Sequence, residues 1–129
     1  MLFRSDDFKS AQCVIARYYN IIDDADNFFK IVMKTVLNSV CSEICCESGS
    51  YYFKKRDYYE SIYWYETAAA AEPELSIDYK EFIPNFNICR AYIELQDWTN
   101  ASKFYKIAAF YKPANPDLQN LNLIIMNNY

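Results

Sequence analysis

The chain has 129 residues, of which 53% are hydrophobic and 23% charged, and this composition is that of one folded domain rather than of a disordered segment. A net charge of −4 and a pI near 4.8 disfavour binding to nucleic acid, despite thirteen tyrosines and nine phenylalanines. No apolar run approaches the roughly 20 residues that cross a bilayer, and the first ten residues lack a secretion signal, so we expect a cytoplasmic protein with no membrane partner.

The first expected unit, about residues 6–39, consists of two amphipathic helices joined by a turn at Asp24. Asp24-Ala25-Asp26 spells the D-x-D motif with which many glycosyltransferases hold a metal and a sugar nucleotide. No strand precedes the triplet and no glycine-rich loop lies near it, so we interpret it as a capping turn.

The second unit, about residues 41–73, shows the helical spacing most clearly. Cys45, Gly49 and Tyr52 lie on one face before Asp57, and a second apolar face follows that residue. Period-two alternation is absent over any useful length, which excludes strands. This unit is therefore predicted to be a helix–turn–helix.

The third unit, about residues 81–113, repeats the second. The segment "QDWTNASKFYKIAAFYKP" aligns with "RDYYESIYWYETAAAAEP", which places Asp97 over Asp57 at 97 − 57 = 40 residues. Asp24 precedes Asp57 by 57 − 24 = 33 residues, so the first unit is a degenerate copy. Asn115-Pro116-Asp117 then predicts a last helix over about 116–128, giving seven helices in an all-α domain.

These units resemble the tetratricopeptide repeat, a 34-residue helix–turn–helix. The resemblance rests on ten positions: Gly49, Tyr52, Tyr65, Ala68 and Pro73 in the second unit, and Tyr92, Ala101, Tyr105, Ala108 and Pro113 in the third. Cys89 replaces the glycine of the third unit. The resemblance implies a right-handed α-solenoid of three repeats and a capping helix, in which small residues let rings fill the space between paired helices.

A narrower likeness spans residues 42–120. A double cysteine opens one repeat at Cys45-Cys46, and Ile83-Pro84 begins the next after a longer linker, which is similar to the helical region behind the catalytic domain of many bacterial family 2 glycosyltransferases. The catalytic domain of those enzymes has no counterpart in these residues. The likeness therefore implies an accessory module, either part of such an enzyme or a stand-alone relative.

Residue types argue against chemistry in the chain itself. Histidine is absent, which removes Ser-His and Cys-His nucleophilic pairs. Cys41 and Cys45 share a helix face, but C-x2-C spacing is missing, so we expect reduced, buried thiols and neither metal nor cofactor. The carboxylate pairs Glu72 with Glu74 and Glu43 with Glu47 are expected to be solvated.

The repeat resemblance implies a concave wall, formed by the first helix of each unit, that binds a protein or peptide. It places eight residues near that wall: Arg17, Asn20, Ser50, Phe53, Lys54, Phe86, Arg90 and Ile93. The arginines and Lys54 would hold an acidic group, although the carboxylate clamp of some relatives is not matched, because Cys13, Glu47 and Ile83 stand at three of its positions. The alternative is a self-association module that forms a homo-oligomer through the first repeat and exposed apolar patches.

Overall fold

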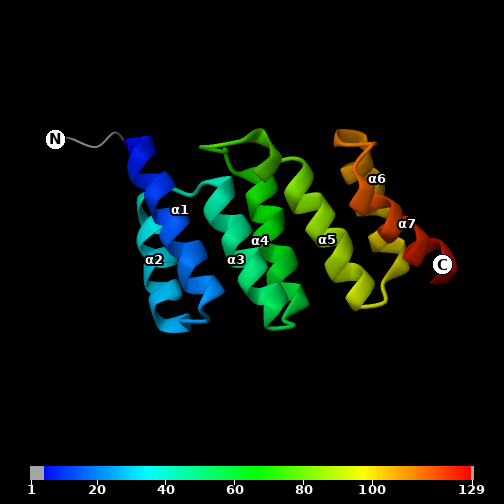
Figure 1. Cartoon of the computed structure of the whole chain (residues 1–129), viewed down its shortest axis with the longest axis horizontal. Coiled ribbons are helices and arrows are strands. Elements are labelled where there is room, and N and C mark those ends of the chain that lie inside the picture. The colour runs from blue at the N-terminus through cyan, green and yellow to red at the C-terminus, as the bar shows by residue number, and fades with distance from the viewer. Residues whose placement is uncertain (1–4, 129) are drawn as a thin grey trace.

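The structure, a computed structural model, describes residues 5–128 and the side chains of residues 11–128 (Figure 1). These residues form seven α-helices and one 3-10 helix: α1 (Ser5–Ile21), α2 (Ala25–Asn38), α3 (Ser42–Lys54), α4 (Tyr58–Ala70), η1 (Ile77–Tyr79), α5 (Phe82–Glu94), α6 (Trp98–Tyr111) and α7 (Pro116–Asn128). No strand occurs in the described part, where a single bridge joins Cys41 to Glu72. The predicted all-α class is confirmed.

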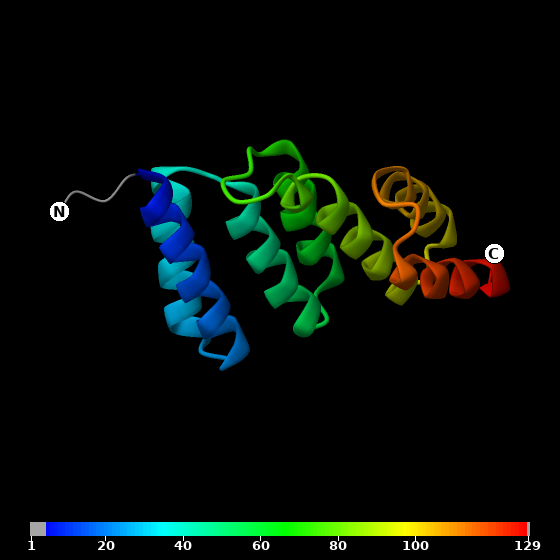
Figure 2. The same cartoon turned by 45° about the horizontal axis from the view of Figure 1, so that its top comes forward.

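The helices form three pairs, α1/α2, α3/α4 and α5/α6, which follow one another along the long axis of the molecule (Figures 1 and 2). The seven α-helices lie where the sequence placed them. Pro84 stands in the first turn of α5, where its missing N–H costs no helical hydrogen bond. Within the described residues, none of the helices is at once long and apolar enough to span a bilayer.

The turn inside each pair is built the same way three times. Asp24, Asp57 and Asp97 are the N-caps of α2, α4 and α6, and each accepts a hydrogen bond from the backbone N–H three residues later, over 3.2, 3.3 and 3.2 Å. These bonds satisfy an N–H that the helix leaves without a partner. The prediction that Asp24-Ala25-Asp26 is a capping turn is confirmed.

The residue before each capping aspartate has a left-handed backbone. Its φ is 61° at Asp23, 62° at Arg56 and 57° at Gln96. Each capping aspartate also donates its N–H to a carbonyl five residues earlier, at Tyr19, Tyr52 and Tyr92. This is the Schellman arrangement, with non-glycine residues where glycine is usual.

Within the second pair a small residue faces a ring. A β-carbon on Gly49 would lie 2.7 Å from two ring carbons of Tyr65, so the ring occupies the space that glycine leaves open. The Ser61 hydroxyl donates to the Gly49 carbonyl over 2.7 Å, which fixes α4 against α3. In the third pair the buried Cys89 and Ala101 share a cluster against which Tyr105 packs half-buried.

The core runs through all three pairs. Its largest cluster includes Phe28 of α2, Ile44 of α3 and Ile88 of α5, all fully buried. The last helix covers the third pair with Leu118, Leu121 and Ile125, as its apolar spacing predicted. Burial of about 1.5–3 kcal/mol per large apolar side chain makes this continuous core the main source of stability.

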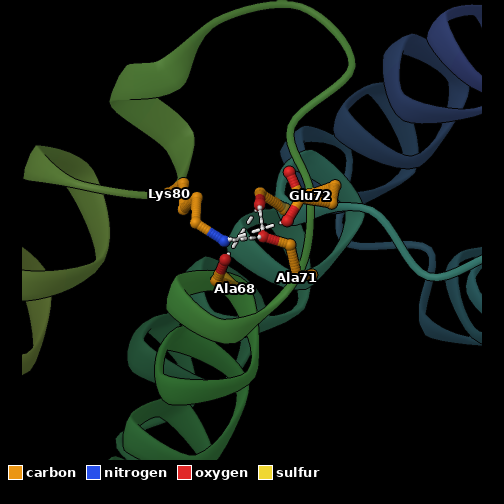
Figure 3. A network of polar contacts seen from close by, with 5 residues as sticks. Ala68, Ala71, Glu72 and Lys80 are labelled. Carbon is orange, nitrogen blue, oxygen red and sulfur yellow. Dashed lines mark hydrogen bonds and ion pairs between the residues drawn. The ribbon is translucent and has the colours of Figure 1, made fainter.

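The long connection between α4 and α5 is held against the N-terminus of α3. The Ser42 hydroxyl donates to the carbonyls of Ala68 and Ala71 over 2.8 and 3.1 Å, and the Lys80 ammonium donates to the Ala71 carbonyl over 2.7 Å (Figure 3). Lys80 also lies 3.5 Å from the Glu72 carboxylate. The connection is thereby part of the folded structure, and it carries Tyr79 toward α1.

Candidate functional site

The odd-numbered helices α1, α3 and α5 contact one another in succession, and side-chain contacts run along them from α1 to α5. We call the surface on these three helices the odd-helix wall. It carries the eight residues that the sequence placed on a binding surface.

Arg90 of α5 is held between two rings on this wall. Its guanidinium carbon lies 4.4 Å from the ring centroid of Phe53 on α3 and 6.0 Å from that of Phe86 on α5. Its Nη1 donates to Oδ1 of Asn87 over 2.8 Å. Cation–π attraction and this hydrogen bond hold the guanidinium in one orientation across two helices.

No carboxylate pairs with Arg90 among the described side chains, and Arg90 itself is only half-buried. A guanidinium has five N–H donors, and one of them is used by Asn87. The remaining donors suit the two oxygens of a carboxylate. Apolar groups next to that carboxylate in a ligand would contact Phe53 and Phe86. Arg90 is therefore a cation that lies against two aromatic rings and still has N–H donors available for an anion.

The other two cations of the wall have partners inside the chain. Arg17 Nε donates to the Glu47 carboxylate over 2.8 Å, and its Nη2 donates to the Tyr79 hydroxyl over 3.3 Å. These two contacts, with that of Glu47 the larger, raise the pKa of Arg17. Lys54 donates to the backbone carbonyl of Asn20. Among the described residues, only Arg17 of the three expected cations pairs with a carboxylate, and Arg90 differs from Lys54 because aromatic rings of α3 and α5 hold its charged group.

The remaining predicted residues do not gather around Arg90. Asn20 is buried, and its Oδ1 has no partner among the described residues. Ser50 is half-buried on α3, and Ile93 packs against the cluster of Cys89, Ala101 and α7. The structure therefore brings together Phe53, Phe86 and Arg90 from the predicted set.

Two contacts of the wall were not anticipated from the sequence. Asn87, which orients Arg90, lies three residues before it, at a spacing that brings two side chains together on a helix. That signal was available but unspecific. Tyr79 comes from the connection before α5, and no local pattern indicates that its hydroxyl reaches Arg17.

The expectation of solvated carboxylates is wrong for Glu43 and Glu47, which are both buried. The Glu43 carboxylate accepts backbone N–H bonds from Glu74, Leu75 and Ser76, the shortest of 2.7 Å. Glu47 pairs with Arg17. Glu43 therefore holds the connection against α3, and Glu47 holds α1 against α3. These contacts give both carboxylates a structural role.

The five cysteines are buried free thiols, as predicted. Cys13 Sγ of α1 lies 4.0 Å from Cys41 Sγ, and the contact with Cys41, together with burial, raises the pKa of Cys13. Burial also raises the pKa of Cys45 and of Cys89 to about 12. Across the described residues, no three histidine, cysteine or acidic side chains are grouped as metal ligands.

Comparisons with family models, with curated proteins and with solved structures give no match to this chain. The resemblances to tetratricopeptide repeats and to the helical region of family 2 glycosyltransferases therefore remain predictions from the sequence. Functional conclusions rest on the geometry of the odd-helix wall.

Proposed function

We propose that the chain is a non-catalytic protein-binding scaffold that holds an acidic segment of a partner on the odd-helix wall. The observation that carries this proposal is Arg90, which lies against the rings of Phe53 and Phe86 and has no carboxylate partner among the described side chains. A glutamate or aspartate side chain, or a chain-terminal carboxylate, supplies the missing anion.

The composition of the site favours a peptide over a small metabolite. Arg90 and its two rings are half-buried on the wall, so part of each side chain is accessible to a partner from solvent. Aromatic and arginine side chains are the residue types that dominate binding energy at protein interfaces. An apolar residue next to an acidic one would use both features.

The resemblance to the accessory region of family 2 glycosyltransferases supports a finer proposal. In this version the module is the C-terminal part, or a stand-alone relative, of a bacterial glycosyltransferase and presents a partner or acceptor peptide to that enzyme. Its own residues supply binding and orientation, while the transfer chemistry belongs to the catalytic domain.

The binding proposal is tested with two short peptides, acetyl-Phe-Glu-Glu-Phe-amide and its glutamine counterpart, titrated into isotope-labelled protein. We expect the side-chain Nε–Hε signal of Arg90 to shift saturably with the acidic peptide and much less with the glutamine peptide. Arg90→Glu should weaken binding of the acidic peptide by about tenfold or more, because an attraction becomes a repulsion.

Arg56→Glu is the matched control, because Arg56 is an exposed arginine at the α3/α4 turn and the charge change is the same. It should leave binding within about twofold of the wild type. Equal binding by Arg90→Glu and the wild type would contradict the proposal, as would equal loss in both variants. Co-purification from lysate with an Arg90→Glu, Phe86→Ala double variant then identifies the natural partner.

A further inference from the structure

The odd-numbered helices share a stripe of three positions that faces the helix following each of them. Counting back 12, 8 and 5 residues from the capping aspartates gives the stripe in α1, α3 and α5. Its members are Gln12, Ala16 and Tyr19; Cys45, Gly49 and Tyr52; and Asn85, Cys89 and Tyr92. The first two residues of each set are buried and the tyrosine is half-buried.

The following helix covers this stripe in each pair. Gly49 lies under the Tyr65 ring of α4, and Tyr92 stacks on Phe104 of α6 with ring centroids 5.7 Å apart. Ala16 is fully buried in the cluster that also contains Phe28 of α2. The stripe is thus the contact surface of an odd helix for its antiparallel partner.

Helix α7 has the same length as α3 and α5, 13 residues, so its stripe can be assigned by position. The third and tenth residues, Leu118 and Ile125, are buried, as are the third and tenth residues of α3 and α5. The fourth, eighth and eleventh residues are Gln119, Leu123 and Met126. Leu123 is 59% exposed and Met126 is 69% exposed. Helix α7 therefore presents to solvent the surface that the other odd helices bury.

We propose that this stripe of α7 is a homodimer interface, on which α7 of a second copy lies antiparallel, in the place that α4 takes on α3. A two-fold axis near Leu123 then buries the same residues of both copies. The proposal does not involve Arg90 and is independent of the peptide-binding function.

Charge favours a second copy of the same helix as the occupant. Asp117 is the one charged residue of Pro116–Asn128, so pairing two copies of α7 brings no like charges together along the stripe. In the antiparallel arrangement the two Asp117 side chains lie at opposite ends of the pair. Antiparallel helix dipoles also attract each other.

The neighbouring helix α6 supplies the complementary charge. A hollow of about 310 Å³ between α6 and α7 is lined by Ser102, Tyr105, Lys106, Asn122, Ile125 and Met126. Lys106 makes no ion pair with any described residue. Lys106 lies near Met126, at the C-terminal end of α7. In the antiparallel pair, Asp117 of the second copy lies at this same end. The hollow has room for an apolar side chain of that copy.

Sedimentation equilibrium of the whole chain over a range from 1 to about 300 µM tests the interface. We expect a monomer–dimer equilibrium in this range, because one helix pair is a small interface. Leu123→Asp should weaken the dimer by about tenfold or more, with unchanged helical circular dichroism, because Leu123 is exposed in the monomer. Leu37→Asp on α2 is the matched control, since Leu37 is 81% exposed and lies in the first pair.

Lys106→Glu should weaken the dimer several-fold, and the double variant Lys106→Glu, Asp117→Lys should restore it to within about twofold at low salt. A monomer throughout the concentration range would overturn the proposal. A dimer that survives Leu123→Asp would also overturn the proposal, because the contact would then lie outside the α7 stripe. A dimer that Leu37→Asp disrupts would overturn it as well, because the contact would then lie on the first pair. Two results together support the proposal: Leu123→Asp weakens the dimer while Leu37→Asp does not, and Asp117→Lys restores the dimer that Lys106→Glu weakens.

Discussion

The junction between the first and second helix pairs differs from the junction between the second and third pairs in the side chains that hold it together. At the first junction most of the contact is made by α1 on α3, and α2 reaches α3 over a short stretch. At the second junction α4 packs along α5. The same helix–turn–helix unit is therefore stacked in two ways.

Polar contacts dominate the packing of α1 on α3. They include the Arg17–Glu47 ion pair, the Lys54 bond to the carbonyl of Asn20, and the Cys13–Cys41 thiol contact. On α1, Gln12 Oε1 and Asn20 Oδ1 are also buried without a partner among the described residues, which costs free energy. Aromatic packing adds to this junction where α2 meets α3, since the Phe28 and Tyr51 rings stack at 4.6 Å.

Apolar packing dominates between α4 and α5. Ile62, Ile88 and Ala91 are buried there, in the core cluster that also extends to α1 and α2, and their apolar side chains need no hydrogen-bond partner. Since apolar contacts are not lost through a single missing bond, we infer that the second junction opens only when the domain unfolds. The first pair should open separately and at lower free energy.

Truncation of Ile88 weakens the second junction, the stronger of the two, and should have the largest effect on stability. Ile88 is 1% exposed, and Ile88→Ala should lower the free energy of unfolding by about 3 kcal/mol through lost burial and a cavity. Native-state hydrogen exchange should show this loss in the slowest amides of α3 to α6. The opening of α1 and α2 should change little; equal loss there would show that the two junctions form one cooperative unit.

Alkaline pH weakens the second and third pairs without a mutation. Cys45 and Cys89 have a pKa of about 12, raised by burial from 9.0, so both stay protonated in the folded state. Their contribution is complete below pH 9, the unfolded value, and is lost as pH rises from 9 to 12. Each thiol should cost up to about 1.4 kcal/mol per pH unit in that window.

Urea unfolding at pH 8, 9 and 10 measures this loss. Cys89→Ala should reduce the slope above pH 9 by one thiol's share, whatever it does to stability at pH 8. An unchanged slope in that variant would show that the Cys89 thiol already ionises in the folded state.

Repetition in the sequence was sufficient to predict the helices and their turns. The three capping aspartates, the Gly49–Tyr65 contact and the apolar side of α7 each follow from residue type and spacing. These features depend on neighbours within one unit or on the fixed geometry of a helix pair. Such neighbours are visible in a single sequence.

The junctions and the wall were predicted less well, because they depend on side chains from distant segments. Glu43 resembled a solvated helix residue, but the connection after α4 folds back and buries its carboxylate against three backbone N–H groups. Arg17, Lys54 and Arg90 were equivalent cations in the sequence. The structure distinguishes them by what lies opposite, which the local pattern does not encode.

Removing the Glu43 carboxylate tests whether the connection belongs to the second junction. Glu43→Ala should cost about 2 kcal/mol, because three backbone N–H groups lose a charged acceptor. The amides of Leu75 and Ser76 should exchange faster by hydrogen exchange. Glu60→Ala, at an exposed acid in α4, is the control and should change neither quantity appreciably.

The Arg17–Glu47 pair sets the strength of the first junction. Arg17 is 54% exposed and Glu47 is 11% exposed at the side chain, so solvent screens the pair in part. A double-mutant cycle with Arg17→Met and Glu47→Gln should give a coupling of about 1 kcal/mol. The loss should appear in the exchange of α1 and α2 amides and leave α5 and α6 unchanged. A uniform loss over all helices would contradict independent opening of the first pair.

Glycine at the left-handed turn residues gives the smallest expected effect and isolates what the pairs have in common. Arg56→Gly and Gln96→Gly should each stabilise the protein by about 0.5 kcal/mol, since relief of the β-carbon strain exceeds the added freedom of the unfolded chain. Arg56→Ala, measured by the same urea unfolding, should bring no gain because its β-carbon keeps the strain. Equal gains would mean that the turns of the second and third pairs carry the same backbone strain. Unequal gains would mean that the neighbours of each turn change the cost of its left-handed residue.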